Sequence, residues 1–166
     1  MTEETSNIAI KLKRLMQTDI MNDTFYVWYS GPYGTINNFR LGNLSTVKPI
    51  EWNEINAALG QCVLAIVTVS EKVKFEFIRY KLYPMGSYSK VYKVDDVRNA
   101  IIWLNLYTDG TFQLFPKRSF NNALIGFLTC IYELGEFICS KDPTMQLPYT
   151  INLSEGKVND QNVLLG

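Results

Sequence analysis

Three segments of the chain show apolar residues at helical spacing. From Asn7 to Ile20 the apolar side chains recur every three or four positions, with lysine and arginine on the other faces, which predicts an amphipathic helix. A second helix is predicted from Glu51 to Glu71 and a third from about Ser119 to Cys139. The first segment fits the end of a coiled coil, and chance amphipathicity explains two turns equally well.

Runs of aromatic and β-branched residues between these helices predict strands. A first hairpin joins Thr24–Ser30 to Phe39–Leu41 across a turn at Gly31-Pro32-Tyr33-Gly34. Further strands are predicted at Lys74–Leu82, Ile101–Tyr107 and Thr111–Phe115, the last two joined by a turn at Asp109-Gly110, and a third hairpin at Leu147–Asn152 and Lys157–Leu165. Helices and hairpins therefore alternate along the chain.

The second and third predicted helices resemble each other. Asn56-Ala57-Ala58-Leu59-Gly60 echoes Asn122-Ala123-Leu124-Ile125-Gly126, and a Phe-x-Leu strand precedes each. Either a β-then-α unit is repeated or two alanine-rich helices are alike by chance. The repeat predicts an α+β fold in which helices cover antiparallel sheets. We expect residues 1–22 to form a separate helix, and residues 23–166 a globular domain whose third unit lacks its helix because the native protein continues.

Composition narrows the class of partner. The chain has 166 residues, 47% of them hydrophobic, and its 16 basic and 16 acidic residues cancel. A neutral chain has no excess charge with which to neutralise nucleic acid phosphates, so we expect no nucleic acid partner. The three cysteines, Cys62, Cys130 and Cys139, lie among apolar residues and are odd in number, which indicates reduced thiols and a cytoplasmic location.

The sequence contains no histidine, the commonest general base and metal ligand. The glycines near Gly31 lack the Gly-Lys-Ser/Thr ending of a phosphate-binding loop, and no two cysteines have metal-ligand spacing. Glu51 and Glu54 form an acid/base pair only if they face a pocket, whereas carboxylates in a first helical turn stabilise the helix dipole. We therefore expect no enzymatic activity, cofactor or metal.

One segment combines apolar side chains with cations. Leu114, Phe115 and Pro116 precede Lys117 and Arg118 just before the third helix. A loop tip of this kind inserts apolar groups into a lipid interface while its cations contact anionic headgroups. Alternatively, the apolar residues are the buried face of an edge strand and the cations are merely solvated.

Two long runs, Gly34 to Gly42 and Glu51 to Gln61, resemble the Beclin family of autophagy proteins. Shorter matches occur at Phe77–Tyr80, at Pro84 with Gly86-Ser87, at Phe120 with Ala123, at Leu147–Tyr149 and at Gly156-Lys157. The segment Pro84 to Lys90 looks more like fungal than animal members. The resemblance extends from Thr24 to Lys157.

The resemblance implies the family's C-terminal β-α repeated, autophagy-specific (BARA) domain, in which three β-sheet/α-helix repeats follow a coiled coil. Family members are non-catalytic regulatory subunits of the class III phosphatidylinositol 3-kinase complex. Their partners are the lipid kinase, a pseudokinase-like scaffold subunit and a coiled-coil subunit, and they act in autophagy and in vacuolar or endosomal sorting. A cytoplasmic protein at the membranes of autophagosome assembly sites, endosomes or vacuoles is thus expected.

Animal members touch membranes through three consecutive aromatic residues. That finger aligns with Leu114, Phe115 and Pro116, of which only Phe115 is aromatic. The resemblance therefore implies weak contact with anionic membranes through residues 114–118. A domain that only docks other subunits, without lipid contact, is the alternative.

Overall fold

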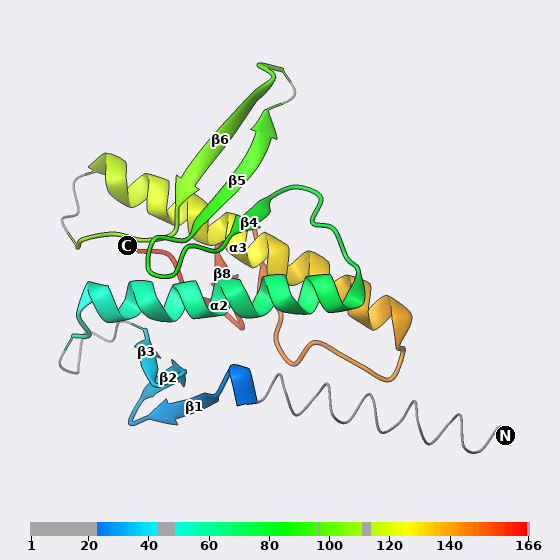
Figure 1. Ribbon diagram of the computed structural model, residues 1–166, viewed down its shortest axis with the longest axis horizontal. Coiled ribbons are helices and arrows are strands. Elements are labelled where there is room, and N and C mark those ends of the chain that lie inside the picture. Colours follow the sequence, from blue (N-terminus) through cyan, green and yellow to red (C-terminus); the bar gives the residue numbers. More distant parts are fainter. Residues whose placement is uncertain (1–22, 43–48, 96, 111–113, 166) are drawn as a thin grey trace, which may run out of the picture.

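A computed structural model describes residues 23–42, 49–95, 97–110 and 114–165. The helix expected at Asn7 to Ile20, and with it the separate segment 1–22, lies outside these residues. Two long helices, α2 (Trp52–Val73) and α3 (Leu114–Lys141), run through the molecule, and small sheets pack around them (Figure 1). The predicted α+β fold is confirmed.

Each predicted hairpin region contains a three-stranded antiparallel sheet. Sheet A consists of β1 (Val27–Ser30), β2 (Tyr33–Ile36) and β3 (Phe39–Leu41), sheet B of β4 (Lys81–Tyr83), β5 (Lys90–Asp95) and β6 (Ala100–Asn105), and sheet C of β7 (Ile151–Asn152), β8 (Lys157–Val158) and β9 (Gln161–Asn162). All three sheets have the strand order of the sequence.

The helix predicted at Glu51 to Glu71 is confirmed as α2, which begins at Trp52 with Glu51 as its extended N-cap residue. The third predicted helix is confirmed, and it begins five residues earlier than expected, at Leu114. The main core lies where these helices meet sheets A and B. Its buried side chains include Ile55, Leu59, Val63, Val91, Leu106, Phe120, Ala123 and Phe127.

The first predicted turn is partly wrong, because β2 occupies Tyr33–Ile36. β2 pairs with both β1 and β3, and its side chains Tyr33 and Ile36 are buried in the core. A second turn at Asn37 and Asn38 makes the additional strand possible. Both asparagines have left-handed backbone angles, with φ of 48° and 67°, which asparagine tolerates better than most residues.

The strand predicted at Lys74–Leu82 is mostly wrong, since only β4 at its end is a strand. Lys74 ends α2 in a left-handed conformation with φ of 55°. Phe75 then packs against α3, with its ring centroid 4.9 Å from that of Phe137 and 5.4 Å from that of Phe77. The aromatic residues that suggested a strand therefore contact a helix.

The second hairpin was predicted with the wrong partner. β6 lies within the predicted strand Ile101–Tyr107, but it pairs with β5, which the sequence analysis did not assign. The strand predicted at Thr111–Phe115 is wrong at Leu114 and Phe115, which begin α3, and its first three residues lie outside the described part. β5 was missed because Lys93 and Asp95 interrupt its apolar pattern.

The echo between the two helices has a structural counterpart. Asn56 donates to the carbonyl of Thr108 and accepts from its N–H, at 2.7 and 3.1 Å. Asn121 makes the same pair of bonds with Leu165, at 2.9 and 3.0 Å. In each case an asparagine of the helix binds the backbone of the segment that leaves the next sheet along the chain. The structural equivalent of Asn56 is therefore Asn121, and not Asn122, with which the sequence comparison aligned it.

Helix α3 is long and apolar enough over Lys117–Lys141 to cross a membrane, judged by length and composition only. Half of its most apolar stretch is buried inside the structure, as in the core helix of a globular protein. Gly126 of α3 explains the close packing, since a Cβ there would lie 2.8 Å from Val91 and 2.9 Å from Tyr80. We therefore treat α3 as a core helix.

Candidate interaction surfaces

The predicted membrane tip lies on a helix. Leu114, Phe115 and Pro116 form the first turn of α3 and are followed by half-buried Lys117 and exposed Arg118. The loop tip expected from the sequence is therefore a helix start. Exposure of the side chains of residues 114–116 would separate lipid contact from protein docking alone. These side chains lie outside the described part of the chain.

Glu54, the carboxylate suspected of acid/base chemistry, is held by an arginine. Arg40 of β3 donates through Nε to Oε1 and through Nη2 to Oε2, both at 2.8 Å, and its backbone N–H donates to Oε1 at 2.9 Å. The hydrogen bond with the Arg40 side chain lowers the pKa of Glu54 to about 2. Glu54 therefore stays ionised near neutral pH and attaches sheet A to α2.

A cavity with a volume of 690 Å³ lies between the start of α2, the loop after β4 and the end of β6. Its lining is Asn53, Asn56, Ser87, Tyr88, Asn105, Tyr107, Thr108, Asp109, Ser119 and Phe120. These residues offer amides, hydroxyls and a single carboxylate, without lysine, histidine or cysteine. Neither Glu51 nor Glu54 lines it, and the set provides no nucleophile beside an oriented base.

Two thiols lie among apolar side chains, Cys130 fully buried and Cys62 partly buried. Burial raises the pKa of Cys62 to about 11 and that of Cys130 to about 12. The Sγ of Cys130 donates a weak hydrogen bond to the carbonyl of Tyr80 at 3.5 Å. These cysteines fill space as protonated thiols, and no cluster of three metal-ligating side chains occurs in the part of the chain that the structure describes.

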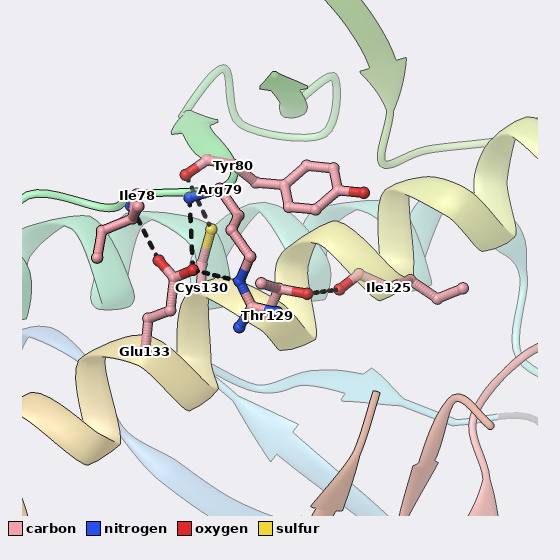
Figure 2. A network of polar contacts seen from close by, with 7 residues as sticks. All are labelled: Ile78, Arg79, Tyr80, Ile125, Thr129, Cys130 and Glu133. Atoms are coloured by element: carbon pink, nitrogen blue, oxygen red, sulfur yellow. Dashed lines mark hydrogen bonds and ion pairs between the residues drawn. The ribbon is translucent and has the colours of Figure 1, made fainter. Parts of the chain in front are cut away.

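A glutamate of α3 organises the chain that enters sheet B. Figure 2 shows Glu133 accepting hydrogen bonds from the backbone N–H groups of Ile78 and Arg79, at 2.9 and 3.4 Å, and from Arg79 Nε at 2.7 Å. Its side chain is only 9% exposed. The Glu133 carboxylate thus satisfies backbone N–H groups that would otherwise need a partner strand. Residues 75–80 can therefore remain irregular.

Sheet A presents aromatic side chains on its edge strand. All four residues of β1 are exposed. The ring of Trp28 in β1 stacks on that of Tyr26, just before the strand, and on that of Tyr29, within it, with centroids 6.2 and 5.1 Å apart. Exposed, stacked aromatic residues are typical of surfaces that bind other proteins.

Sheet B presents a second aromatic surface. Trp103 of β6 contacts Tyr92 of β5 and Tyr83 of β4, with ring centroids 4.7 and 5.6 Å apart. Lys90 places its Nζ 6.0 Å from the Trp103 ring. The sequence pattern did not predict this surface, although the apolar residues at alternate positions, Ile101 and Trp103, indicate that one face of β6 differs from the other.

Comparison with known proteins identifies relatives over most of the chain. Residues 15–166 match the family model described as Apg6 BARA domain. Beclin-1 of Xenopus tropicalis is 40% identical over 151 residues, which are 91% of this chain and 33% of that protein. Beclin-1-like protein B of Dictyostelium discoideum is 44% identical over 142 residues, which are 85% of this chain and 16% of that protein.

A fungal relative is named for vacuolar sorting. Vacuolar protein sorting-associated protein 30 of Gibberella zeae is 35% identical over an alignment of 182 residues, covering 97% of this chain and 37% of that protein. The chain thus spans between 16% and 37% of the length of these relatives. The family match and these identities show that the chain belongs to the family of Beclin-1 and vacuolar protein sorting-associated protein 30 and carries its BARA domain.

Proposed function

We propose that this chain is a non-catalytic docking and targeting domain of a class III phosphatidylinositol 3-kinase complex. The role lies in autophagy and vacuolar or endosomal protein sorting, on the cytoplasmic side of the membranes concerned. The observation that carries the proposal is the pair of exposed aromatic surfaces, on β1 and on sheet B, in a chain of the Beclin family. Such surfaces suit binding, whereas the cavity beside the start of α2 offers no catalytic group of residues.

The proposed partners are the lipid kinase subunit, the pseudokinase-like scaffold subunit and a coiled-coil subunit that pairs through the segment ending at residue 22. Within this complex, the stacked rings of Tyr26, Trp28 and Tyr29 form the protein-docking surface. Aromatic side chains contribute large contact areas at low entropic cost, which favours them at the centres of interfaces.

Affinity capture of the full-length protein tests this assignment. The wild type should recover all three subunits, identified by mass spectrometry, and Trp28→Ser/Tyr29→Ser should reduce their recovery about tenfold, since aromatic anchors dominate interface energies. Ile78→Thr is a control, because Ile78 is 79% exposed and lies outside sheet A. Absence of the lipid kinase from the wild-type sample would refute the proposed complex.

Membrane contact through Leu114, Phe115, Pro116, Lys117 and Arg118 is the second part of the proposal. Flotation with vesicles of phosphatidylcholine and phosphatidylserine compares the wild type with Leu114→Asp/Phe115→Asp and with Lys117→Ala/Arg118→Ala. Both variants should float less, and added salt should weaken only the contribution of the cations. If both float like the wild type with an unchanged circular dichroism spectrum, the protein-docking alternative without lipid contact replaces this part.

A further inference from the structure

Sheet A contains a hollow beside its aromatic edge strand. The hollow has a volume of 310 Å³, at the small end of binding pockets, which span about 300–1,000 Å³. Trp28, Thr35 and Arg40 line it, and they lie in register across β1, β2 and β3. Tyr26 and Tyr29 line it as well. One row of side chains across the sheet thus shares a hollow with the stacked aromatic rings.

Thr35 is the most buried residue of this lining. It is only 7% exposed, and its hydroxyl has no hydrogen-bond partner among the described residues. Every fully buried side-chain nitrogen or oxygen in the described part of the chain has a partner, so the Thr35 hydroxyl must reach the open hollow. Buried polar groups in proteins are nearly always hydrogen-bonded, which indicates that a ligand completes this site.

Two further donors of the lining are also uncommitted. Trp28 is 56% exposed, and its indole N–H has no acceptor in the part of the chain that the structure describes. Arg40 donates to Glu54 through its backbone N–H, Nε and Nη2, and its Nη1 has no acceptor there. An indole, a hydroxyl and a guanidinium nitrogen are therefore available to a ligand.

The charge of the lining excludes an acidic ligand. Arg40 is its only cation among the described residues, and the contact with Glu54 at 2.8 Å neutralises it. A phosphorylated or acidic segment would find no unpaired positive charge. The described lining contains no carboxylate either, so a ligand rich in N–H or O–H donors would lack strong acceptors. The hollow suits an uncharged ligand that supplies acceptors and apolar surface.

A proline-rich segment has this chemistry. Each proline carries a backbone carbonyl but no N–H, and its ring is apolar. In the polyproline II (PPII) conformation such a segment has no internal hydrogen bonds, so its carbonyls remain free to accept. We propose that the hollow of sheet A, together with the rings of Tyr26, Trp28 and Tyr29, binds a proline-rich segment of a protein partner in the PPII conformation.

The spacing of the aromatic rings suits such a segment. The ring centroid of Trp28 lies 6.2 Å from that of Tyr26 and 5.1 Å from that of Tyr29. A PPII chain advances about 3.1 Å per residue, so about two residues span each of these steps. Grooves lined by aromatic residues bind proline-rich segments because the PPII helix is already formed and loses little entropy on binding.

This inference rests on the proposed function, because it names the kind of segment that the docking surface of sheet A recognises. A subunit that docks there should carry an accessible, uncharged, proline-rich segment. The proposed membrane contact of residues 114–118 is independent of this site.

Fluorescence anisotropy of a labelled decaproline peptide, titrated with the full-length protein, tests the site. The wild type should bind this peptide and not the decamer of D-proline, which has the same composition and forms the helix of opposite hand. Trp28→Phe keeps an aromatic ring but removes the N–H, and it should weaken binding about tenfold. The matched control is Trp103→Phe, the same change at an exposed tryptophan of sheet B, which should bind like the wild type.

Thr35 provides a second, independent variant. Thr35→Val replaces the hydroxyl by a methyl group of similar size and should weaken binding about tenfold, whereas Thr35→Ser keeps the hydroxyl and should retain most of the affinity. Circular dichroism checks that each variant is folded. Equal affinity of the wild type, Trp28→Phe and Thr35→Val would overturn the proposal, as would equal binding of the two decamers. A loss in Trp103→Phe alone would place the peptide on sheet B and refute the site.

These outcomes are distinguishable from failure of the proposed function. If affinity capture recovers all three subunits but decaproline does not bind, the complex stands and the proline-rich occupant is wrong. If decaproline binds with the expected response to Trp28→Phe and Thr35→Val while no lipid kinase is captured, the site stands and the assignment to the complex is wrong.

Discussion

Sheets A and B have the same three-stranded meander, but different interactions attach them to their helices. Sheet A packs on α2 through the buried side chains of Tyr33 and Ile36, and it is also bound by polar side chains, through Arg40 with Glu54 and through Asn37, which donates to Gln61 Oε1 at 2.9 Å. Sheet B is attached to α3 by the buried side chain of Val91 and by the Glu133 hydrogen bonds just before β4. Sheet A is therefore held to its helix by both packing and an ion pair, whereas packing under one end of sheet B leaves the β5–β6 hairpin projecting from the helices.

The largest expected loss of stability comes from the contact between α2 and the loop that joins β4 to β5 in sheet B. A Cβ at Gly60 would collide with the backbone carbonyl of Gly86, which cannot yield as a side chain does. Gly60→Ala should therefore lower the free energy of unfolding by about 3 kcal/mol, measured by urea denaturation. Gly34→Ala in sheet A is the control, because no atom lies within 4 Å of its Cβ position, and an equal loss there would contradict the packing argument.

Removal of the Glu133 carboxylate, which binds the segment before β4, should destabilise the fold less. Glu133→Ala leaves the backbone N–H of Ile78 and the side chain of Arg79 without their acceptor. We expect a loss of about 2 kcal/mol in unfolding free energy, with faster amide hydrogen exchange at residues 75–80. Glu136→Ala, an exposed position on the same helix, should change neither quantity. Unchanged exchange in Glu133→Ala would show that the segment is held by packing alone.

The smallest expected change in stability comes from the ion pair between Arg40 of sheet A and Glu54 of α2. Because the folded pKa of Glu54 is about 2, below its ordinary value of 4.5, its ion pair stabilises the fold fully above about pH 5 and is lost as pH falls toward 2. Arg40 is 42% exposed, so solvent screening keeps the contribution of the ion pair to stability small. Urea unfolding at pH 7 and pH 3 should show this additional loss in the wild type and not in Glu54→Gln.

A matched variant makes that pH test specific. Glu76→Gln removes an exposed glutamate for which the described residues provide no ion pair, and it should retain the pH dependence of the wild type. A parallel response of Glu54→Gln and the wild type would mean that other carboxylates cause the loss. Sheet A would then depend on its packing against α2, without a measurable contribution from the ion pair.

Helices were predictable from the sequence and strands only in part. The helical face of α2 repeats over twenty-two residues, so its bounds followed from the pattern. β2 was hidden because its residues Tyr33 and Gly34 also suit a turn, and β5 because charged residues interrupt it. The irregular segment after Lys74 needed Glu133, a residue more than fifty positions away, and single-sequence patterns carry no such information.

The candidate surfaces also differ in whether their residues are consecutive in the sequence or come together only in the fold. The apolar and cationic segment at Leu114 to Arg118 was found because its residues are consecutive, although the structure places it on a helix. The aromatic surface of sheet B combines Tyr83, Tyr92 and Trp103 from three strands whose pairing was not predicted. Without the register of Tyr92 with Trp103, their shared surface could not be inferred.

β6 is also the last strand of its sheet, and among the described residues nothing pairs with its outer edge. Every second residue of such a strand directs its backbone N–H and C=O groups outward, where another strand can bind them. Strand addition between copies begins at edges of this kind, and an adjoining apolar face accelerates it. The isolated chain should therefore aggregate in a concentration-dependent manner that starts at Ala100–Asn105, and a lysine at Ile102 would improve its solubility by blocking that edge.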